Sequence, residues 1–120
     1  SLLDWAKKYE KPVLGICRGM QVMAKWSGIK LISANNHTNV RHKIDCFTND
    51  DFFPEKVNSY HDFRIESCPQ DFIITAKSKD NTIEAIKHKT LPWEGWMWHP
   101  EREKEFTSID TQRMINLFNS

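Results

Sequence analysis

The amino-acid sequence predicts a mixed α/β domain, and three observations support that prediction. A short apolar run at 13–16 leads directly into a helical pattern of apolar residues over 18–27. Two strand-like segments flank a turn at 79–81, as in a hairpin, and a second helical pattern lies at 109–118. With 120 residues, 39% of them hydrophobic and 28% charged, the chain has the size and composition of one globular domain.

The first part of the chain predicts a helix, a strand and a second helix. Apolar side chains recur at helical spacing over 1–10, and Pro12 ends that pattern. The run at 13–16 suits a strand that is buried on both faces of a parallel sheet. The helix at 18–27 ends at Gly28, because glycine readily adopts the left-handed conformation that terminates helices.

Polar loops and strand-like segments alternate in the rest of the chain. We expect strands at 30–33, 42–48, 72–76, 82–86 and 94–98, with the third and fourth paired as the hairpin. We expect loops or irregular structure at 35–41, 49–55 and 60–66, and a helix at 109–118 with Asp110 in its first turn. This order of elements is typical of a mixed α/β domain.

Only about two of these segments are apolar enough to be buried in a parallel sheet, and one of them lies near the start of the chain. A doubly wound sheet needs more parallel strands than that. We therefore expect residues 1–120 to be the C-terminal portion of a single domain that lacks its N-terminal strands. A preceding segment, or a second copy of the chain in a homo-oligomer, would complete the sheet.

Charge and cysteine content exclude several classes of protein. The net charge of +1 gives no electrostatic basis for binding nucleic acid or a membrane surface, and no apolar run approaches the roughly 20 residues that span a bilayer. The start of the chain lacks a basic region followed by an apolar stretch. The three cysteines form no C-x-x-C pair, so we expect a cytoplasmic protein without a disulfide scaffold.

The strongest local signal for chemistry is a cysteine between the first strand and the helix that follows it. Gly15 and Gly19 lie two residues before and two residues after Cys17, a spacing that permits the sharp turn of a nucleophile elbow. The N-terminus of the helix then favours the thiolate, and the backbone N–H of Arg18 faces an oxyanion formed on an attacked carbonyl. The alternative is that Cys17 is a small buried apolar residue, the common role of a free cysteine.

A second signal supplies a base. A cysteine nucleophile needs a base, and the base needs an orienting group. His99 follows the strand at 94–98, and Glu101 stands two residues later, within reach of one ring nitrogen. Pro100 stiffens the segment between them. The two signals together favour a catalytic over a structural role for Cys17.

Several motifs carry a resemblance to a known family. Residues 15–21, G-I-C-R-G-M-Q, resemble the nucleophile motif of class I glutamine amidotransferases, and residues 98–101, W-H-P-E, resemble their His/Glu motif. The segments V-N-S-Y-H at 57–61, I-E-A at 83–85 and H-K-I at 42–44 are similar to segments of the γ-glutamyl hydrolase-like branch, which cleaves γ-glutamyl amides of small molecules. The resemblance implies a flavodoxin-like three-layer α/β sandwich of the class I glutamine amidotransferase type.

The resemblance also implies a role for each motif residue. Cys17 would be the nucleophile, His99 the general base and acid, and Glu101 the residue that orients the imidazole. Arg18 would supply an oxyanion-hole N–H. The implied substrate-binding residues are Gln21, Asn58, Ser59, Tyr60 and His61. No cofactor and no metal are implied, and the expected partner is a small-molecule γ-glutamyl substrate.

The implied reaction is hydrolysis of a γ-glutamyl C–N bond through a glutamyl thioester, which releases glutamate and an amine or phosphoramidate. A likeness to hydrolases of capsule phosphoramidate synthesis implies γ-glutamyl-CDP-amidate as the substrate. Two alternatives stay open: a glutaminase subunit that supplies ammonia to a synthetase, and an inactive binding or assembly module. The family's second oxyanion donor comes from a glycine-rich loop expected before residue 1, and His61-Asp62-Phe63 stands where the family has H-H-Q or H-Q.

One further spacing is that of a metal site. His37, His42 and Cys46 have the H-x4-H-x3-C spacing of zinc ligands. No fourth ligand is evident, and the segment is expected to be a loop. Surface histidines and a core cysteine are therefore the preferred interpretation.

Overall fold

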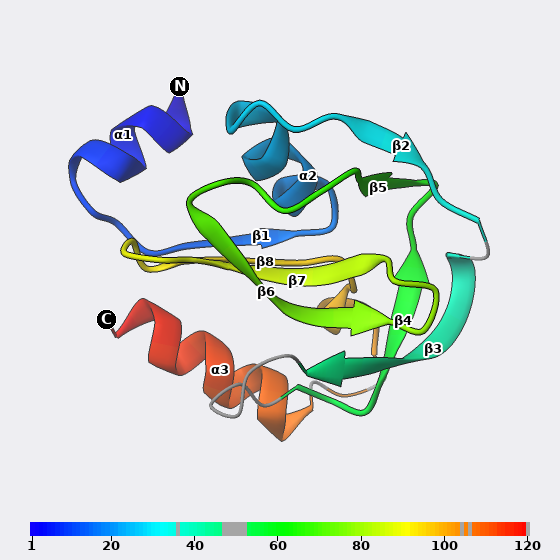
Figure 1. The fold of residues 1–120 in the computed structure, drawn as a ribbon. Coiled ribbons are helices and arrows are strands. Elements are labelled where there is room, and N and C mark those ends of the chain that lie inside the picture. Colours follow the sequence, from blue (N-terminus) through cyan, green and yellow to red (C-terminus); the bar gives the residue numbers. More distant parts are fainter. Residues whose placement is uncertain (36, 47–52, 104, 106, 120) are drawn as a thin grey trace.

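The structure is a computed structural model that describes residues 1–35, 37–46, 53–103, 105 and 107–119. Within these residues, the structure contains a six-stranded sheet, a separate two-stranded sheet and helices that lie against the larger sheet (Figure 1). None of the described helices is long and apolar enough to cross a membrane.

The helices lie on both faces of the larger sheet. Helices α1 (Leu2–Lys8) and α2 (Arg18–Trp26) lie on one side of it, and α3 (Ser108–Phe118) lies on the other (Figure 1). The three helices predicted from the apolar spacing are confirmed, and so is the three-layer α/β architecture.

The larger sheet is mixed. Its strands, in spatial order, are β1 (Val13–Ile16), β8 (Trp93–Trp96), β7 (Ile83–His88), β6 (Phe72–Ser78), β3 (Thr38–Cys46) and β4 (Lys56–Tyr60). β1 and β8 run parallel, and the other neighbours in this sheet are antiparallel. Because β1 and β8 are parallel, the residues that follow them emerge at the same edge of the sheet.

Two further strands, β2 (Leu31–Ser33) and β5 (Phe63–Ile65), form the small antiparallel sheet. The predicted hairpin of β6 and β7 is confirmed, with Asn81 in its turn at a φ of 67°. The predicted strand before β3 is confirmed as β2, but its partner β5 lies in a segment predicted to be irregular.

Local sequence explains where the first two helices begin and end. Ser1 caps α1: its hydroxyl accepts a hydrogen bond from the backbone N–H of Asp4, and the Asp4 carboxylate completes the capping box. Lys7 and Lys8 lie in the last turn, where cations favour the helix dipole. Gly28 follows α2 with a φ of 88°, as predicted for a residue that ends a helix.

Close packing fixes α2 against the sheet. Met20 and Met23 are buried between the helix and the strands. A Cβ atom added at Gly95 in β8 would lie 2.7 Å from Cγ of Met20, so the helix approaches the strand where β8 has no side chain. On the other face, Trp96 and Trp98 stack with ring centroids 5.2 Å apart. Both halves of the core therefore rest on β8.

Two predicted loops are wrong. The segment 35–41, predicted to be a loop, contains the start of β3 at Thr38. The segment 60–66, predicted to be irregular, contains the end of β4 and all of β5. The reason is that neither segment shows the apolar alternation that marks a strand: residues 38–41 at the start of β3 are all exposed, and β5 has only three residues, of which Ile65 is the buried one. The predictions at 47–52 lie outside the described residues.

Candidate functional site

Cys17 occupies a strained backbone position between β1 and α2. Its φ of 51° and ψ of −98° lie outside the regions that residues with a side chain usually adopt. Its backbone N–H donates to the carbonyl of Trp96 in β8, over 2.6 Å. A Cβ atom at Gly15 would lie 2.6 Å from the backbone carbon of Gly19, so the turn requires glycine at that position. This is the strand-to-helix elbow that the glycine spacing predicts.

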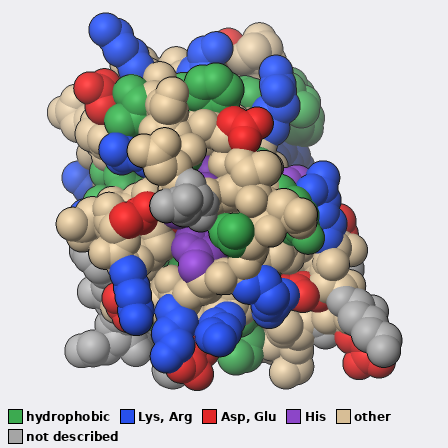
Figure 2. Space-filling view, turned by 90° about the vertical axis from the view of Figure 1, so that its right-hand side faces the viewer, with side chains coloured by type: hydrophobic (Ala, Val, Ile, Leu, Met, Phe, Trp, Pro, Cys, Tyr) green, Lys and Arg blue, Asp and Glu red, His purple; other side chains and the backbone are tan. Residues whose placement is uncertain are grey.

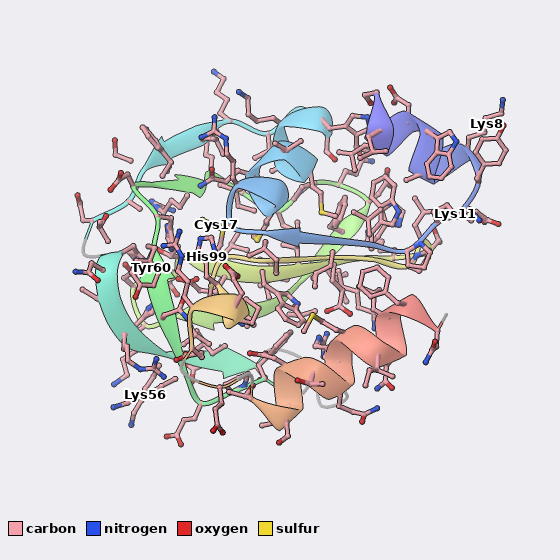
Figure 3. All side chains as sticks on the ribbon, turned by 180° about the vertical axis from the view of Figure 1, so that it is seen from behind. Lys8, Lys11, Cys17, Lys56, Tyr60 and His99 are labelled. Atoms are coloured by element: carbon pink, nitrogen blue, oxygen red, sulfur yellow. The ribbon has the colours of Figure 1, made fainter. Side chains whose placement is uncertain are left out.

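His99 and Cys17 lie at the same edge of the sheet, because the parallel strands β1 and β8 deliver both residues there (Figure 3). Its Nδ1 lies 2.8 Å from a carboxylate oxygen of Glu101, which belongs to the short 3₁₀ turn Pro100–Arg102. The His99 side chain is 17% exposed and that of Glu101 is 49% exposed. A carboxylate that accepts the Nδ1 proton leaves Nε2 of the imidazole free to exchange protons at the site.

Asn58 in β4 binds the backbone of His99 on both sides of its Cα. Its side-chain oxygen accepts from the N–H of His99, and its amide donates to the carbonyl of His99, both over 2.8 Å. Asn58 is 3% exposed, so these bonds use its polar atoms inside the protein. The two bonds fix the backbone that carries the imidazole.

Tyr60 and Arg102 flank the same edge. The Tyr60 ring meets the His99 ring edge-on at a centroid distance of 6.1 Å, and the guanidinium of Arg102 lies 4.6 Å from the centre of the Tyr60 ring. Figure 3 shows Tyr60, His99 and Cys17 at one end of the strands, with Lys8 and Lys11 at the other. Sequence reasoning missed Arg102, although it directly follows the W-H-P-E motif.

Burial controls the electrostatics of Cys17. Burial raises the pKa of the Cys17 thiol, while the backbone N–H of Arg18 and the charge of Arg102 lower it and the carboxylates of Glu84 and Glu101 raise it. The net direction is upward. The backbone N–H at the start of α2 therefore lowers the pKa of the Cys17 thiol, as the sequence predicts, but burial raises that pKa by more. A neutral thiol of this kind needs a neighbouring base to become a nucleophile.

Three of the other predicted residues have their polar atoms occupied or buried. Gln21, in α2, donates from its side-chain amide to the carbonyl of Phe63 over 3.0 Å. Ser59 is 1% exposed and donates to the carbonyl of His37 over 2.6 Å. His61 is 2% exposed and faces Glu84. Their predicted contact with substrate stays a prediction, and in this arrangement they support the strands around the site.

Exposure at this edge differs from residue to residue: Cys17 is 8% exposed, whereas the side chain of Glu101 is 49% exposed. In the space-filling view of this end of the molecule, a histidine is visible near the middle of the face, and Lys and Arg side chains gather below it (Figure 2). The arrangement brings a thiol, an imidazole with a carboxylate behind it, and a backbone N–H to one accessible edge. Groups of these kinds are used in cysteine-dependent attack on an amide carbonyl.

Comparison with known proteins identifies the family. The glutamine amidotransferase class-I family matches residues 1–116. The chain belongs to this family. The γ-glutamyl-CDP-amidate hydrolase of Campylobacter jejuni is 40% identical over 98 residues, which cover 82% of this chain and 46% of that protein. The glutamine-hydrolysing GMP synthase subunit of Methanopyrus kandleri is 33% identical over 98 residues, or 77% of this chain and 52% of that protein.

Solved structures of this glutamine amidotransferase family share the fold. The crystal structure of a putative GMP synthase subunit from Thermoplasma acidophilum has a TM-score of 0.80 at 25% identity. The matched region covers 97% of this chain and 60% of the Thermoplasma chain. A glutamine amidotransferase from Thermotoga maritima has a TM-score of 0.71 at 21% identity, and the match covers 98% of this chain and 51% of the Thermotoga chain. The chain thus spans about half the length of the relatives it matches.

Proposed function

We propose that this chain carries the nucleophile, base and orienting carboxylate of a cysteine-dependent γ-glutamyl amide hydrolase. The observation that supports the proposal is the position of Cys17 in a strained elbow, beside a His99–Glu101 pair at the end of the strand that pairs with β1. Both kinds of curated relative are named for hydrolysis of a glutamine-type amide.

The first half of the reaction forms a thioester. His99 takes the proton of the Cys17 thiol as sulfur attacks the γ-carbonyl carbon, and the backbone N–H of Arg18 binds the oxyanion. The C–N bond then breaks, and the leaving nitrogen takes the proton from His99. Glutamate remains bound to Cys17 as a thioester.

The second half releases glutamate. His99 accepts a proton from water as the water oxygen attacks the thioester carbon, and the C–S bond breaks. The sulfur recovers the proton from His99, which restores the thiol and the neutral imidazole. Glu101 stabilises the imidazolium in both halves and holds the ring in one tautomer.

We propose γ-glutamyl-CDP-amidate as the substrate. The identity of 40% to the Campylobacter jejuni hydrolase supports this choice. The phosphoramidate leaving group is anionic, and the guanidinium of Arg102 and the exposed side chain of Arg18 lie next to the site. Two cations at this edge suit an anionic leaving group better than the neutral ammonia released from glutamine.

The test is glutamate release by the complete protein that carries this chain. The panel is glutamine, γ-glutamyl amines and γ-glutamyl-CDP-amidate, each with the parent protein, with Cys17→Ala and with Cys46→Ser as the matched control at an exposed cysteine. We expect release from the phosphoramidate to fall about 10⁴- to 10⁶-fold in Cys17→Ala and to persist in Cys46→Ser. Release that survives Cys17→Ala would overturn the proposed nucleophile.

A glutaminase that works with a synthetase is the second candidate, because the glutamine-hydrolysing GMP synthase subunit of Methanopyrus kandleri is 33% identical and a related putative subunit shares the fold. That function predicts preference for glutamine and stimulation by a synthetase partner. Release from the phosphoramidate without a partner or ATP excludes it. Release from none of the compounds would instead favour a binding or assembly module.

A further inference from the structure

Four polar side chains meet inside the protein next to the elbow, and the reaction does not use them. We call His37, His42, His61 and Glu84 the histidine–glutamate cluster. Glu84 in β7 is fully buried, and His37 and His61 are each 2% exposed. An oxygen of Glu84 lies 3.3 Å from Nδ1 of His37, 3.4 Å from Nε2 of His42 and 3.8 Å from Nε2 of His61.

The hydrogen-bond partners fix which ring nitrogens face the carboxylate with a lone pair. His37 Nε2 lies 2.7 Å from a carboxylate oxygen of Asp80, which can only accept its proton. His61 donates from Nδ1 to the carbonyl of Phe63 over 3.0 Å. In the neutral imidazoles, Nδ1 of His37 and Nε2 of His61 therefore point lone pairs at the anion. That arrangement is repulsive unless a cation lies between them.

Further atoms of the cluster are buried without any hydrogen bond. They are Nε2 of His42, Nε2 of His61 and both carboxylate oxygens of Glu84. A buried carboxylate without hydrogen-bond donors is costly, and native proteins rarely tolerate one. The missing partner has to be positively charged and small enough to fit between these atoms.

We propose that the three imidazoles and Glu84 bind one structural zinc ion. Four ligand atoms about 2.0 Å from a tetrahedral zinc ion lie about 3.3 Å from one another. The distances of 3.3 and 3.4 Å from Glu84 to His37 and His42 match that value, and the 3.8 Å to His61 closes with a small movement. The ligand atoms of His37, His42 and Glu84 all lie within 4.8 Å of one another. His61 is not part of this three-residue group, so it is the ligand that has to move toward the ion.

The groups around the cluster are those that accompany metal-binding histidines. A ligating histidine usually donates its other N–H to a carboxylate or a backbone carbonyl, which are the roles of Asp80 and Phe63 here. Three imidazoles select zinc over magnesium or calcium, which prefer oxygen ligands. Four protein ligands leave no open position, so the ion would be structural and not catalytic.

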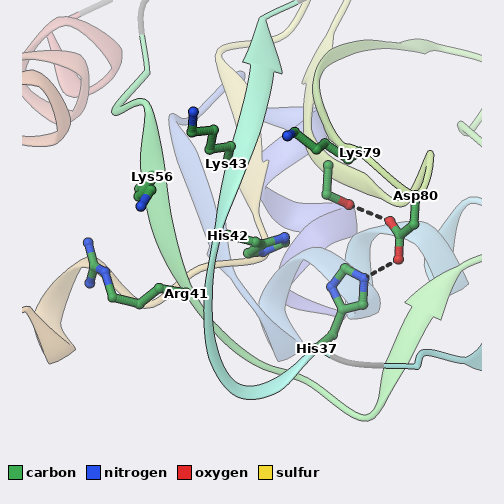
Figure 4. Close-up of a pocket in the computed structure, with 8 residues that line it drawn as sticks. His37, Arg41, His42, Lys43, Lys56, Lys79 and Asp80 are labelled. Carbon is green, nitrogen blue, oxygen red and sulfur yellow. Dashed lines mark hydrogen bonds and ion pairs between the residues drawn. The ribbon is translucent and has the colours of Figure 1, made fainter.

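A surface pocket borders the cluster. The pocket has a volume of about 420 Å³, and His37, His42 and Asp80 are among the residues that line it (Figure 4). Its other lining residues are Arg41, Lys43, Lys56, Ser78 and Lys79. The bound ion would connect β7 to β3 and to the residue that follows β4. β3 and β4 are neighbours in the sheet, but neither is a neighbour of β7.

The test measures metal in the complete protein after purification without added zinc and after dialysis against a chelator. We expect one zinc per chain, and after replacement by Co²⁺ the intense visible absorption of a four-coordinate site. His42→Asn removes the ligand atom at the pocket end of the cluster and is expected to weaken zinc binding by at least about 100-fold. Its matched control, His88→Asn, changes a histidine outside the cluster and keeps an acceptor for the N–H groups of Thr90 and Leu91.

Asp80→Asn provides a second test that keeps all four ligands. The new amide donates to Nε2 of His37, moves the ring proton to Nδ1 and blocks that ligand atom, so affinity is expected to fall about 10- to 100-fold. A protein that binds no zinc overturns the proposal, and a protonated imidazole is then the positive charge that faces Glu84. Binding that survives His42→Asn, or a Co²⁺–thiolate charge-transfer band, also overturns it, since the ligands are then cysteines.

Discussion

The side chain at the Cys17 elbow and the side chains of the histidine–glutamate cluster are held in position by different parts of the structure. At the elbow, a backbone φ of 51° at Cys17 and the steric requirement at Gly15 fix the position of the Cys17 side chain. In the cluster, side chains from distant strands hold one another inside the protein. The position of Cys17 therefore depends on local backbone geometry, whereas the cluster depends on tertiary contacts.

The largest expected effect comes from a substitution that disturbs the backbone of the elbow. Gly15→Ala places a Cβ 2.6 Å from the backbone carbon of Gly19, which cannot move without distorting α2. We expect the free energy of unfolding to fall by about 3 kcal/mol. Gly19→Ala is the matched control, because a Cβ there meets nothing within 4 Å, and it is expected to be neutral or stabilising by up to about 1 kcal/mol. Equal stability of the two variants in chemical denaturation would contradict the steric requirement.

The next effect concerns the imidazole at the open edge. Glu101→Gln keeps the shape of the side chain but cannot stabilise the imidazolium of His99, which lies 2.8 Å away. We expect kcat to fall about 100-fold with little change in KM. Glu105→Gln, an exposed glutamate nearby, is expected to leave both values unchanged. A rise in KM at constant kcat would assign Glu101 to substrate binding instead.

A smaller effect links the two regions through β4. Asn58→Ala leaves the N–H and the carbonyl of His99 without their partners. We expect the free energy of unfolding to fall by about 2 kcal/mol and kcat to fall about tenfold, because these two bonds fix the backbone that carries the imidazole. Ser59→Ala removes a buried hydrogen bond on the cluster side of the same strand and is expected to lower stability without lowering kcat. A similar loss of kcat in both variants would show that general loosening is responsible.

The smallest expected effect concerns the pKa of the Cys17 thiol. Because burial raises the pKa of Cys17, the rate of its alkylation by iodoacetamide should rise with pH around a midpoint above 9.0, the ordinary thiol value. The folded protein holds this proton more tightly than the unfolded chain does. The stability contributed by the buried thiol is therefore present below the ordinary pKa and is lost as pH rises through the folded pKa. Mass spectrometry of the Cys17 peptide measures the midpoint, and a value below 9.0 would show that the helix N-terminus outweighs burial.

Periodicity predicted the elements that bury apolar side chains. All three helices, β1 and the hairpin of β6 and β7 follow from apolar spacing, Pro12 and Gly28. It did not predict where β3 begins, or β5, because residues 38–41 are all exposed and β5 is only three residues long, so neither shows an apolar alternation. It also did not predict β4, which buries Asn58 and Ser59 in place of apolar residues. A polar residue in sequence is expected to face water, and only its contacts in the fold show that it is buried.

The sequence by itself determined the elbow and the triad candidates, because each depends on residues close together in the chain. Gly15, Cys17 and Gly19 define one turn, and His99 and Glu101 are two residues apart. Tertiary structure alone decided that His37 and His42 meet Glu84 and not Cys46, which is exposed. The spacing of candidate ligands within one segment was therefore a poor guide. The order of the strands in the sheet brings together residues as far apart in sequence as His37 and Glu84, which are 47 positions apart, and so sets the composition of the buried cluster.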